Sequence, residues 1–237
     1  MHHRFWLMMA GTSLGMGCGH SLSDSAEVRD QLTPTDWAVD GCRTVASAFG
    51  NVTAWRTEIP TVIQVEWATV TPSASAVIFE FDGELHQTPL EAGVRTGHEA
   101  WLLGIPAHTP VRFVMVKEED DERVCSSAWI IETGGIPAAL PELNVESTVE
   151  LATLDGFLVA PAITTGQSFL SLIDGHGRYV WAYRHEELVW RMRMGLDGRS
   201  VLFNHNAAGE DEPGPIHRIA MDGTPLETVE IDGAHRD

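Results

Sequence analysis

The sequence of 237 residues predicts an all-β protein: a two-sheet sandwich followed by a partial β-propeller. Short runs that alternate between apolar and polar residues recur through residues 44–133 at roughly 8–12-residue spacing, which is typical of a sandwich. Three Asp-Gly pairs separate similar runs after residue 151. Residues 44–133 show no sustained helical period.

The alternating runs of the first half have the pattern of half-buried strands. Branched or aromatic residues stand at every second position, so one face of each strand is apolar. Clusters of Pro, Gly, Asp and Ser between the runs favour turns. The expected strands lie around residues 63–67, 77–81, 100–103, 111–116 and 129–131. Their number and spacing predict a sandwich of about 90 residues over 44–133.

One corner between these runs resembles the E-to-F corner of fibronectin type III domains. Residues 102–113 (LLGIPAHTPVRF) follow that pattern, but Val111 stands where the family has a tyrosine that hydrogen-bonds across the corner. The resemblance implies an immunoglobulin- or fibronectin type III-like sandwich. The Gly- and Pro-rich stretch that follows predicts a linker over residues 134–150, because neither residue fits inside a β-ladder.

The Asp-Gly pairs of the second half begin at Asp174, Asp197 and Asp222. Asp-Gly between apolar runs is a strong hairpin signal, because the turn needs a positive φ. Two such hairpins make a four-stranded unit of about 48 residues, the size of a propeller blade. Residues 151–237 therefore predict about one to two blades, too few to close a ring. We expect a truncated coding sequence; completion by oligomerisation and marginal folding are the alternatives.

Residues 1–17 have the layout of a secretory signal, with a weakly basic start and an uncharged, apolar or small stretch. That stretch is too short to span a bilayer. Gly17 and Cys18 resemble a bacterial lipobox, although Gly15 stands where leucine is usual. The resemblance implies lipidation at Cys18, with ordinary cleavage or an uncleaved anchor as alternatives. We therefore expect an exported periplasmic, outer-membrane or cell-surface lipoprotein that contacts the membrane through its lipid, with residues 18–43 as a polar tether.

Composition argues against nucleic acid as a partner and leaves undecided a disulfide and a weak cation site. The formal net charge of −19 argues against nucleic-acid binding. Cys42 and Cys125 can form a disulfide after export, but the sequence does not show whether they lie close enough. The acidic residues 210–212 near His205 can bind a cation weakly, the simpler reading being a solvated loop. The sequence predicts neither a metal centre nor a cofactor.

The hairpins of the second half resemble those of bacterial arylsulfate sulfotransferases. Residues 171–183 (SLIDGHGRYVWAY) look like that family's D-x-x-G-x-x-V-W hairpin, and residues 196–203 (LDGRSVLF) and 219–223 (IAMDG) look like the next two. The final GAHRD resembles the family's H-H-D motif, with His235 matching its first histidine and Arg236 replacing its second. The resemblance covers about residues 155–237, and the family's small leading β-domain suits residues 44–133.

This resemblance implies sulfuryl transfer between phenols, with aryl sulfates or phenols as small-molecule partners and no soluble cofactor. In the family a central histidine takes the sulfuryl group covalently, and other histidines and an arginine stabilise the sulfate oxygens. His235 is the one catalytic candidate carried over, its alternative being a loose terminal residue. The nucleophile has no counterpart, so we expect no activity. The alternative is a non-enzymatic, surface-tethered binding or structural module. The sequence does not determine the oligomeric state.

Overall fold

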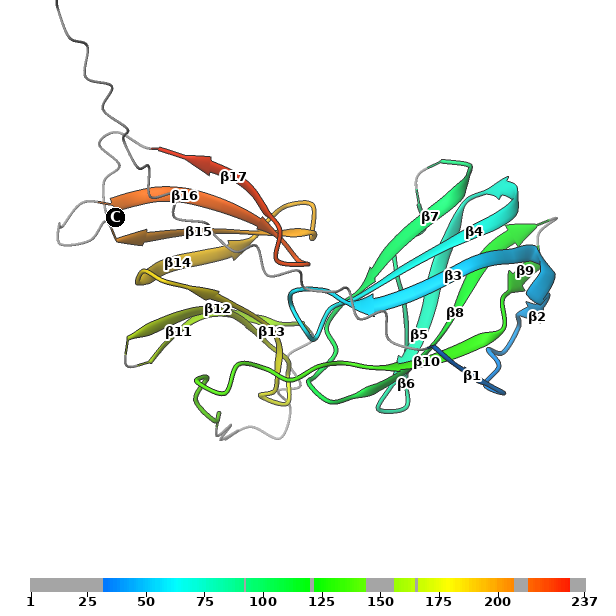
Figure 1. Ribbon diagram of the computed structural model, residues 1–237, viewed down its shortest axis with the longest axis horizontal. Coiled ribbons are helices and arrows are strands. Elements are labelled where there is room, and N and C mark those ends of the chain that lie inside the picture. Colours follow the sequence, from blue (N-terminus) through cyan, green and yellow to red (C-terminus); the bar gives the residue numbers. More distant parts are fainter. Residues whose placement is uncertain are drawn as a thin grey trace, which may run out of the picture.

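The computed structural model describes residues 32–91, 93–119, 122–143, 156–164, 166–206 and 213–230. Apart from one 3₁₀ turn, Ala46–Ala48, the regular elements of these residues are strands, as the sequence predicts. Figure 1 shows a sandwich built from β1 to β10 and, beside it, the sheets built from β11 to β17. Within these ranges no helix is long and apolar enough to cross a membrane.

The sandwich has a small and a large sheet. The small sheet is antiparallel and has the order β3-β4-β7. The large sheet has the order β1-β10-β8-β5-β6, with β9 paired to β8 and β2 paired to β9. The bounds of the small sheet are β3 (Phe49–Arg56), β4 (Ile63–Ser73) and β7 (Arg95–Leu102). Those of the large sheet are β1 (Thr33–Thr35), β2 (Arg43–Thr44), β5 (Ser75–Phe81), β6 (Glu84–Gln87), β8 (Pro110–Glu119), β9 (Glu122–Cys125) and β10 (Ala128–Glu132).

The alternation read from the sequence decides which side chains fill the space between these sheets. On β4, Ile63, Val65 and Trp67 are buried, whereas the intervening Glu66 is exposed. They pack against Val77 on β5 and other inward residues of the large sheet. The division of strands between the two sheets is that of the immunoglobulin-like class, except that β6 stays beside β5. The predicted strand positions are confirmed in β4, β5, β7, β8 and β10.

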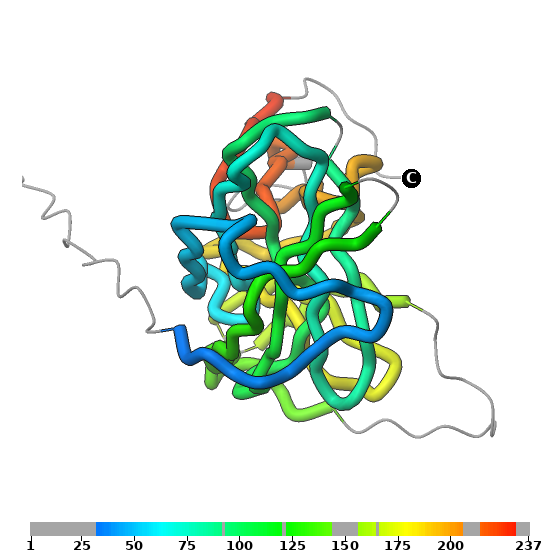
Figure 2. The backbone as a smooth tube through the Cα atoms, turned by 90° about the vertical axis from the view of Figure 1, so that its right-hand side faces the viewer, coloured from blue at the N-terminus to red at the C-terminus, as the bar shows by residue number. Residues whose placement is uncertain are grey.

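The predicted tether, residues 18–43, differs from the structure in its second part. Thr33–Thr35 pairs with β10, and Trp37 and Val39 pack on the outer face of the large sheet. Figure 2 shows this segment, in blue, crossing the outside of the sandwich. The physical reason is that β5 and β8 are apolar on both faces, so Ile78 and Val114 also need cover. The sandwich therefore begins before residue 44.

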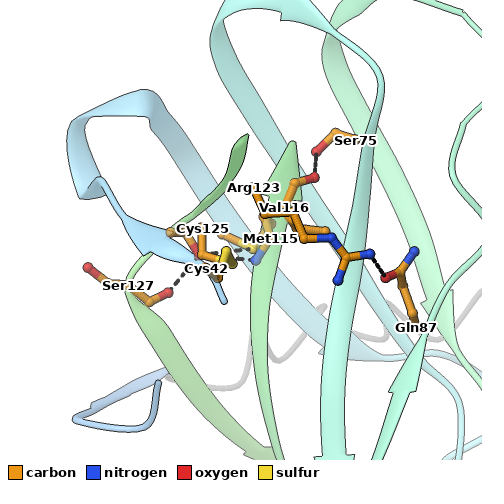
Figure 3. The surroundings of a disulfide bond; sticks show 9 residues. Cys42, Ser75, Gln87, Met115, Val116, Arg123, Cys125 and Ser127 are labelled. Atoms are coloured by element: carbon orange, nitrogen blue, oxygen red, sulfur yellow. Dashed lines mark hydrogen bonds between the residues drawn. A yellow bond between two sulfur atoms is a disulfide. The ribbon is translucent and has the colours of Figure 1, made fainter. Parts of the chain in front are cut away.

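A disulfide fixes this covering segment in place. Cys42 and Cys125 are bonded, with their Cα atoms 5.8 Å apart, so the structure forms the bridge that the sequence leaves open (Figure 3). Beside it, the hydroxyl of Ser75 donates to the carbonyl of Val116 at 2.8 Å. Trp67 Nε1 donates to the same hydroxyl at 3.0 Å, which satisfies the polar atom of a buried indole.

The second half forms two further antiparallel sheets, with the orders β11-β12-β13 and β14-β15-β16-β17. Each predicted Asp-Gly pair lies in a turn between paired strands, so the three hairpins are confirmed. In each turn the aspartate side chain accepts the N–H two residues ahead, which holds the turn closed. The bounds are β11 (Leu158–Thr164), β12 (Gln167–Ile173), β13 (Tyr179–His185), β14 (Val189–Met194), β15 (Ser200–Asn206), β16 (Pro213–Ala220) and β17 (Pro225–Val229).

These two sheets pack face to face and against one end of the sandwich. β14 contacts β11 and β12, and an apolar layer between the sheets includes Leu172, Trp181 and Phe203. Ile59 and Val62, which precede β4, belong to the same layer. The described part of the predicted linker, residues 134–143, also packs: its Gly134 N–H donates to the Pro60 carbonyl at 2.7 Å. One end of the sandwich therefore contributes to the apolar layer between the two sheets, while the sandwich keeps a separate core of its own.

Candidate functional site

Three histidines meet where the layer between the two sheets reaches its edge. His185 ends β13, in line with Trp181 and Tyr183, while His205 on β15 continues the row of Phe203. His217 on β16 is the cross-strand partner of Phe203. The alternation that builds the apolar layer therefore aims all three imidazoles into the same space. One nitrogen of each ring lies within 4.8 Å of the other two.

The rings of this trio, His185, His205 and His217, pack on one another and on Phe203. The ring centre of His205 lies 5.0 Å from those of His185 and His217, and the latter two are 5.6 Å apart. Phe203 stacks on His217 at 5.0 Å and meets His185 edge-on at 4.9 Å. These contacts hold the rings against the apolar layer, so a large rotation of any ring would cost packing.

A hydrogen bond orients one member of the trio, and a close contact with a carboxylate orients a second. His217 Nδ1 lies 3.1 Å from Thr228 Oγ1 on the neighbouring strand. His205 Nδ1 pairs with the carboxylate of Glu187, which follows β13. His185 Nε2 and His217 Nε2 are buried and find no hydrogen-bond partner among the described residues. Buried polar nitrogens are usually paired, so this pair marks the trio as unusual.

Burial lowers the pKa of His185 and of His217 below the usual value of 6.5. The His205 ring next to them lowers both pKa values further, because two imidazolium charges in contact repel. The carboxylate of Glu187 acts in the opposite direction on both. Both shifted rings therefore favour the neutral form, whose lone-pair nitrogen can accept a hydrogen bond or a metal ion.

A second histidine network lies inside the sandwich and has a structural explanation. His98 Nδ1 lies 2.6 Å from Glu91 Oε2, and His98 Nε2 lies 3.0 Å from Thr69 Oγ1. Carboxylate, imidazole and hydroxyl follow one another as in a nucleophilic triad. Thr69, however, is buried, and its hydroxyl donates to the Arg95 carbonyl. Since the ring of His98 also stacks on Trp67, the network ties the segment at Glu91 to β4 and β7.

An apolar cavity of about 330 Å³ lies between the sandwich and the two sheets. The sandwich contributes Val62 and Leu103 to its wall, and Phe157, just before β11, adds a ring. The two sheets contribute Trp181 and Met194. Trp181 Nε1 donates to the Met221 carbonyl at 2.7 Å, so the indole presents an apolar face. None of the residues that line this cavity is charged or a histidine.

The comparisons with known proteins leave the family open. No family model matches the chain, and no curated protein matches it. Among solved structures, a segment of two fibronectin type III domains from chicken tenascin aligns with 77% of this chain and 83% of that chain, at 10% identity and a TM-score of 0.29. A TM-score this low establishes no common fold, so the description of the sandwich rests on its own strand order. The resemblance to arylsulfate sulfotransferases finds no support in these comparisons.

The residues singled out from the sequence mostly lie elsewhere. Cys18, His235 and the acidic residues 210–212 fall outside the described residues. His176 is exposed in its turn. In the sequence, His205 stands out only because it precedes the acidic residues 210–212, and its neighbours in space are not apparent. The alternating pattern places each histidine of the trio on the same strand face as large apolar residues. This pattern does not show which strand faces pack together, so it does not predict the cluster.

Proposed function

We propose that this chain is an exported, non-enzymatic binding module that holds a small, neutral aromatic molecule between its sandwich and its two C-terminal sheets. The observation that carries the proposal is the cavity of about 330 Å³, lined by Phe157 and Trp181. Concave, mostly apolar sites between domains are where proteins usually bind small molecules. The sequence layout of residues 1–17 supports export, and Gly17-Cys18 supports attachment through Cys18.

The chemistry of the cavity walls selects the ligand class. A cavity of about 150 Å³ holds a benzene ring, so this one has room for a substituted phenol. Trp181 and Phe157 offer ring faces and edges, while Val62 and Met194 supply aliphatic contacts. A sulfate group would lose its hydration here without meeting a charged partner, which is costly. The walls therefore suit a neutral phenol better than an aryl sulfate.

The arrangement of the second half supports an origin among arylsulfate sulfotransferase-like propellers. Two twisted antiparallel sheets, whose strands are connected by Asp-Gly hairpins, lie face to face with β11 beside β14, as adjacent blades of a propeller do. In such a ring the adjoining strands β11 and β14 would lie nearest the centre. Within their described residues neither strand carries a histidine, and this favours a role without sulfuryl transfer.

A titration with phenol, followed by isothermal calorimetry, tests the binding role. We expect the substitution Met194→Trp, at a partly buried wall of the cavity, to weaken phenol binding at least tenfold because the larger ring fills the space. The matched control is Met192→Trp, two residues earlier on β14 and not part of the wall, which should bind as the parent chain does. Equal affinities for all three proteins, or no binding to the parent, would contradict the proposal.

Sulfuryl transfer is the second candidate, and the GAHRD resemblance at residues 233–237 favours it. Incubating the full chain with a fluorogenic aryl sulfate and an acceptor phenol should give no turnover beyond that of buffer. Turnover that disappears in His235→Ala would overturn the binding-only role and assign the chain to the enzyme class. His176→Ala, in an exposed turn, serves as the control substitution.

A further inference from the structure

We propose that the trio, His185, His205 and His217, forms a binding site for a divalent transition-metal ion of the zinc type. This site lies at the edge of the layer between the two sheets, apart from the aromatic cavity, since no member of the trio lines that cavity. The inference therefore stands independently of the proposed function. Three imidazoles are a frequent protein ligand set for zinc.

The spacing of the rings suits a single ion. Zinc bound by imidazoles at 2.0–2.1 Å places two tetrahedral ligand nitrogens about 3.4 Å apart. In the structure the three ligand nitrogens lie within 4.8 Å of one another. Small side-chain rotations that shorten these separations by up to about 1.4 Å therefore complete the ligand geometry. No strand has to move, because the side chains already point into one space.

The polar contacts of the trio set the ligand atoms. In the neutral tautomer whose Nδ1 donates to Thr228, His217 carries its lone pair on Nε2, a buried nitrogen without a partner among the described residues. His205 with its proton on Nδ1, toward Glu187, also carries a lone pair on Nε2. A carboxylate behind a histidine is the usual outer support of a zinc ligand, since it fixes the tautomer and raises ligand basicity.

The packing around the trio keeps the site in place. Phe203 contacts His185 and His217 and forms an apolar floor beneath them. Gly214 on β16 lies against His205, so closely that a Cβ there would come 2.6 Å from the His205 carbonyl oxygen and 3.2 Å from its ring. The rings are therefore confined from two directions, which is the preorganisation that metal sites on strands need.

The same surroundings favour a cation over an anion such as sulfate. Glu187 adds a negative charge beside the site, which repels an anion and attracts a metal ion. Neutral imidazoles suit zinc, copper, iron and nickel rather than calcium or magnesium.

Metal titrations on the chelator-treated full chain test this inference. Calorimetry with Zn²⁺ should show one ion bound tightly per chain, and excess Zn²⁺ chelator should abolish this binding. Co²⁺ bound at the same site should give the visible absorption of tetrahedral coordination. We expect His205→Gln and His217→Gln to weaken Zn²⁺ binding at least a hundredfold. Glu187→Gln keeps all three imidazoles and should weaken it about tenfold to a hundredfold, as loss of an outer carboxylate does.

Two controls identify the site. His176→Gln, in an exposed turn, and the double substitution His2→Gln/His3→Gln should bind Zn²⁺ as the parent chain does. If the affinity of Glu187→Gln and of the trio variants equals that of these controls, or if the parent chain binds no Zn²⁺, the inference is wrong. Should a trio variant fail to fold, Glu187→Gln decides, because the Glu187 side chain is 41% exposed and glutamine has nearly the same size and shape.

Discussion

Replacing Trp181 by alanine should lower the free energy of unfolding by about 3–5 kcal/mol, the cost of truncating a fully buried aromatic residue. Trp181 is 1% exposed and lies in the apolar layer that joins the two C-terminal sheets to the end of the sandwich. Its Nε1 also donates to the Met221 carbonyl at 2.7 Å. The substitution therefore creates a cavity and leaves a buried carbonyl without its partner, and both effects destabilise the folded state.

Urea unfolding followed by circular dichroism measures this loss. The matched control is Trp190→Ala on β14, whose side chain is 51% exposed and should cost less than about 1 kcal/mol. Trp181→Phe keeps most of the packing but not the hydrogen bond, so its loss should fall between the two. If Trp181→Ala and Trp190→Ala unfold at the same urea concentration, the apolar layer is not what holds the two halves together.

Removing the Cys42–Cys125 disulfide should lower the free energy of unfolding by about 2–4 kcal/mol. The bridge spans a sequence separation of 83 residues, from just before β2 to the end of β9, and so encloses most of the sandwich. Opening a loop of that length restores conformational entropy to the unfolded chain worth about 4.5 kcal/mol in the chain-entropy model. The bridge also anchors the segment in which Trp37 and Val39 cover the large sheet.

The double variant Cys42→Ala/Cys125→Ala, compared with the parent chain by thermal and urea unfolding, measures this contribution. Cys18→Ser is the control, since Cys18 lies outside the covering segment and should not change the unfolding curve. A reducing agent should lower the stability of the parent and of Cys18→Ser, and leave the double variant unchanged. Equal stability of the double variant and the parent would show that the bridge adds nothing to the fold.

Much of the secondary structure could be predicted because its causes are local. Asp197 followed by Gly198 closes a turn through its own side chain and a glycine with φ 63°, and neither depends on distant residues. The alternation around Val65 likewise predicts which side of β4 is buried. The segment at Trp37 escaped prediction because its few apolar residues show no period, and only the apolar outer face of β5 and β8 explains their burial.

The trio could not be predicted from the same patterns. His205 and His217 lie on neighbouring strands, but their alignment depends on a register that shifts between Asn204 and Asn206. His185 comes from the other sheet, and nothing in its local sequence says which face of that sheet meets β15. Contacts of this kind arise from the packing of two sheets, which is the sum of many side-chain contacts and not a property of one strand.

The sequence by itself determined the all-β class, the positions of most strands and the three hairpin turns, because period-two alternation and Asp-Gly turns act over a few residues. Only the tertiary structure decided that residues 32–43 belong to the sandwich, that Cys42 and Cys125 are bonded, and that an aromatic cavity and a histidine trio lie against the two C-terminal sheets. Such features bring together residues far apart in the chain, so they follow from how apolar faces find cover, which no single segment encodes.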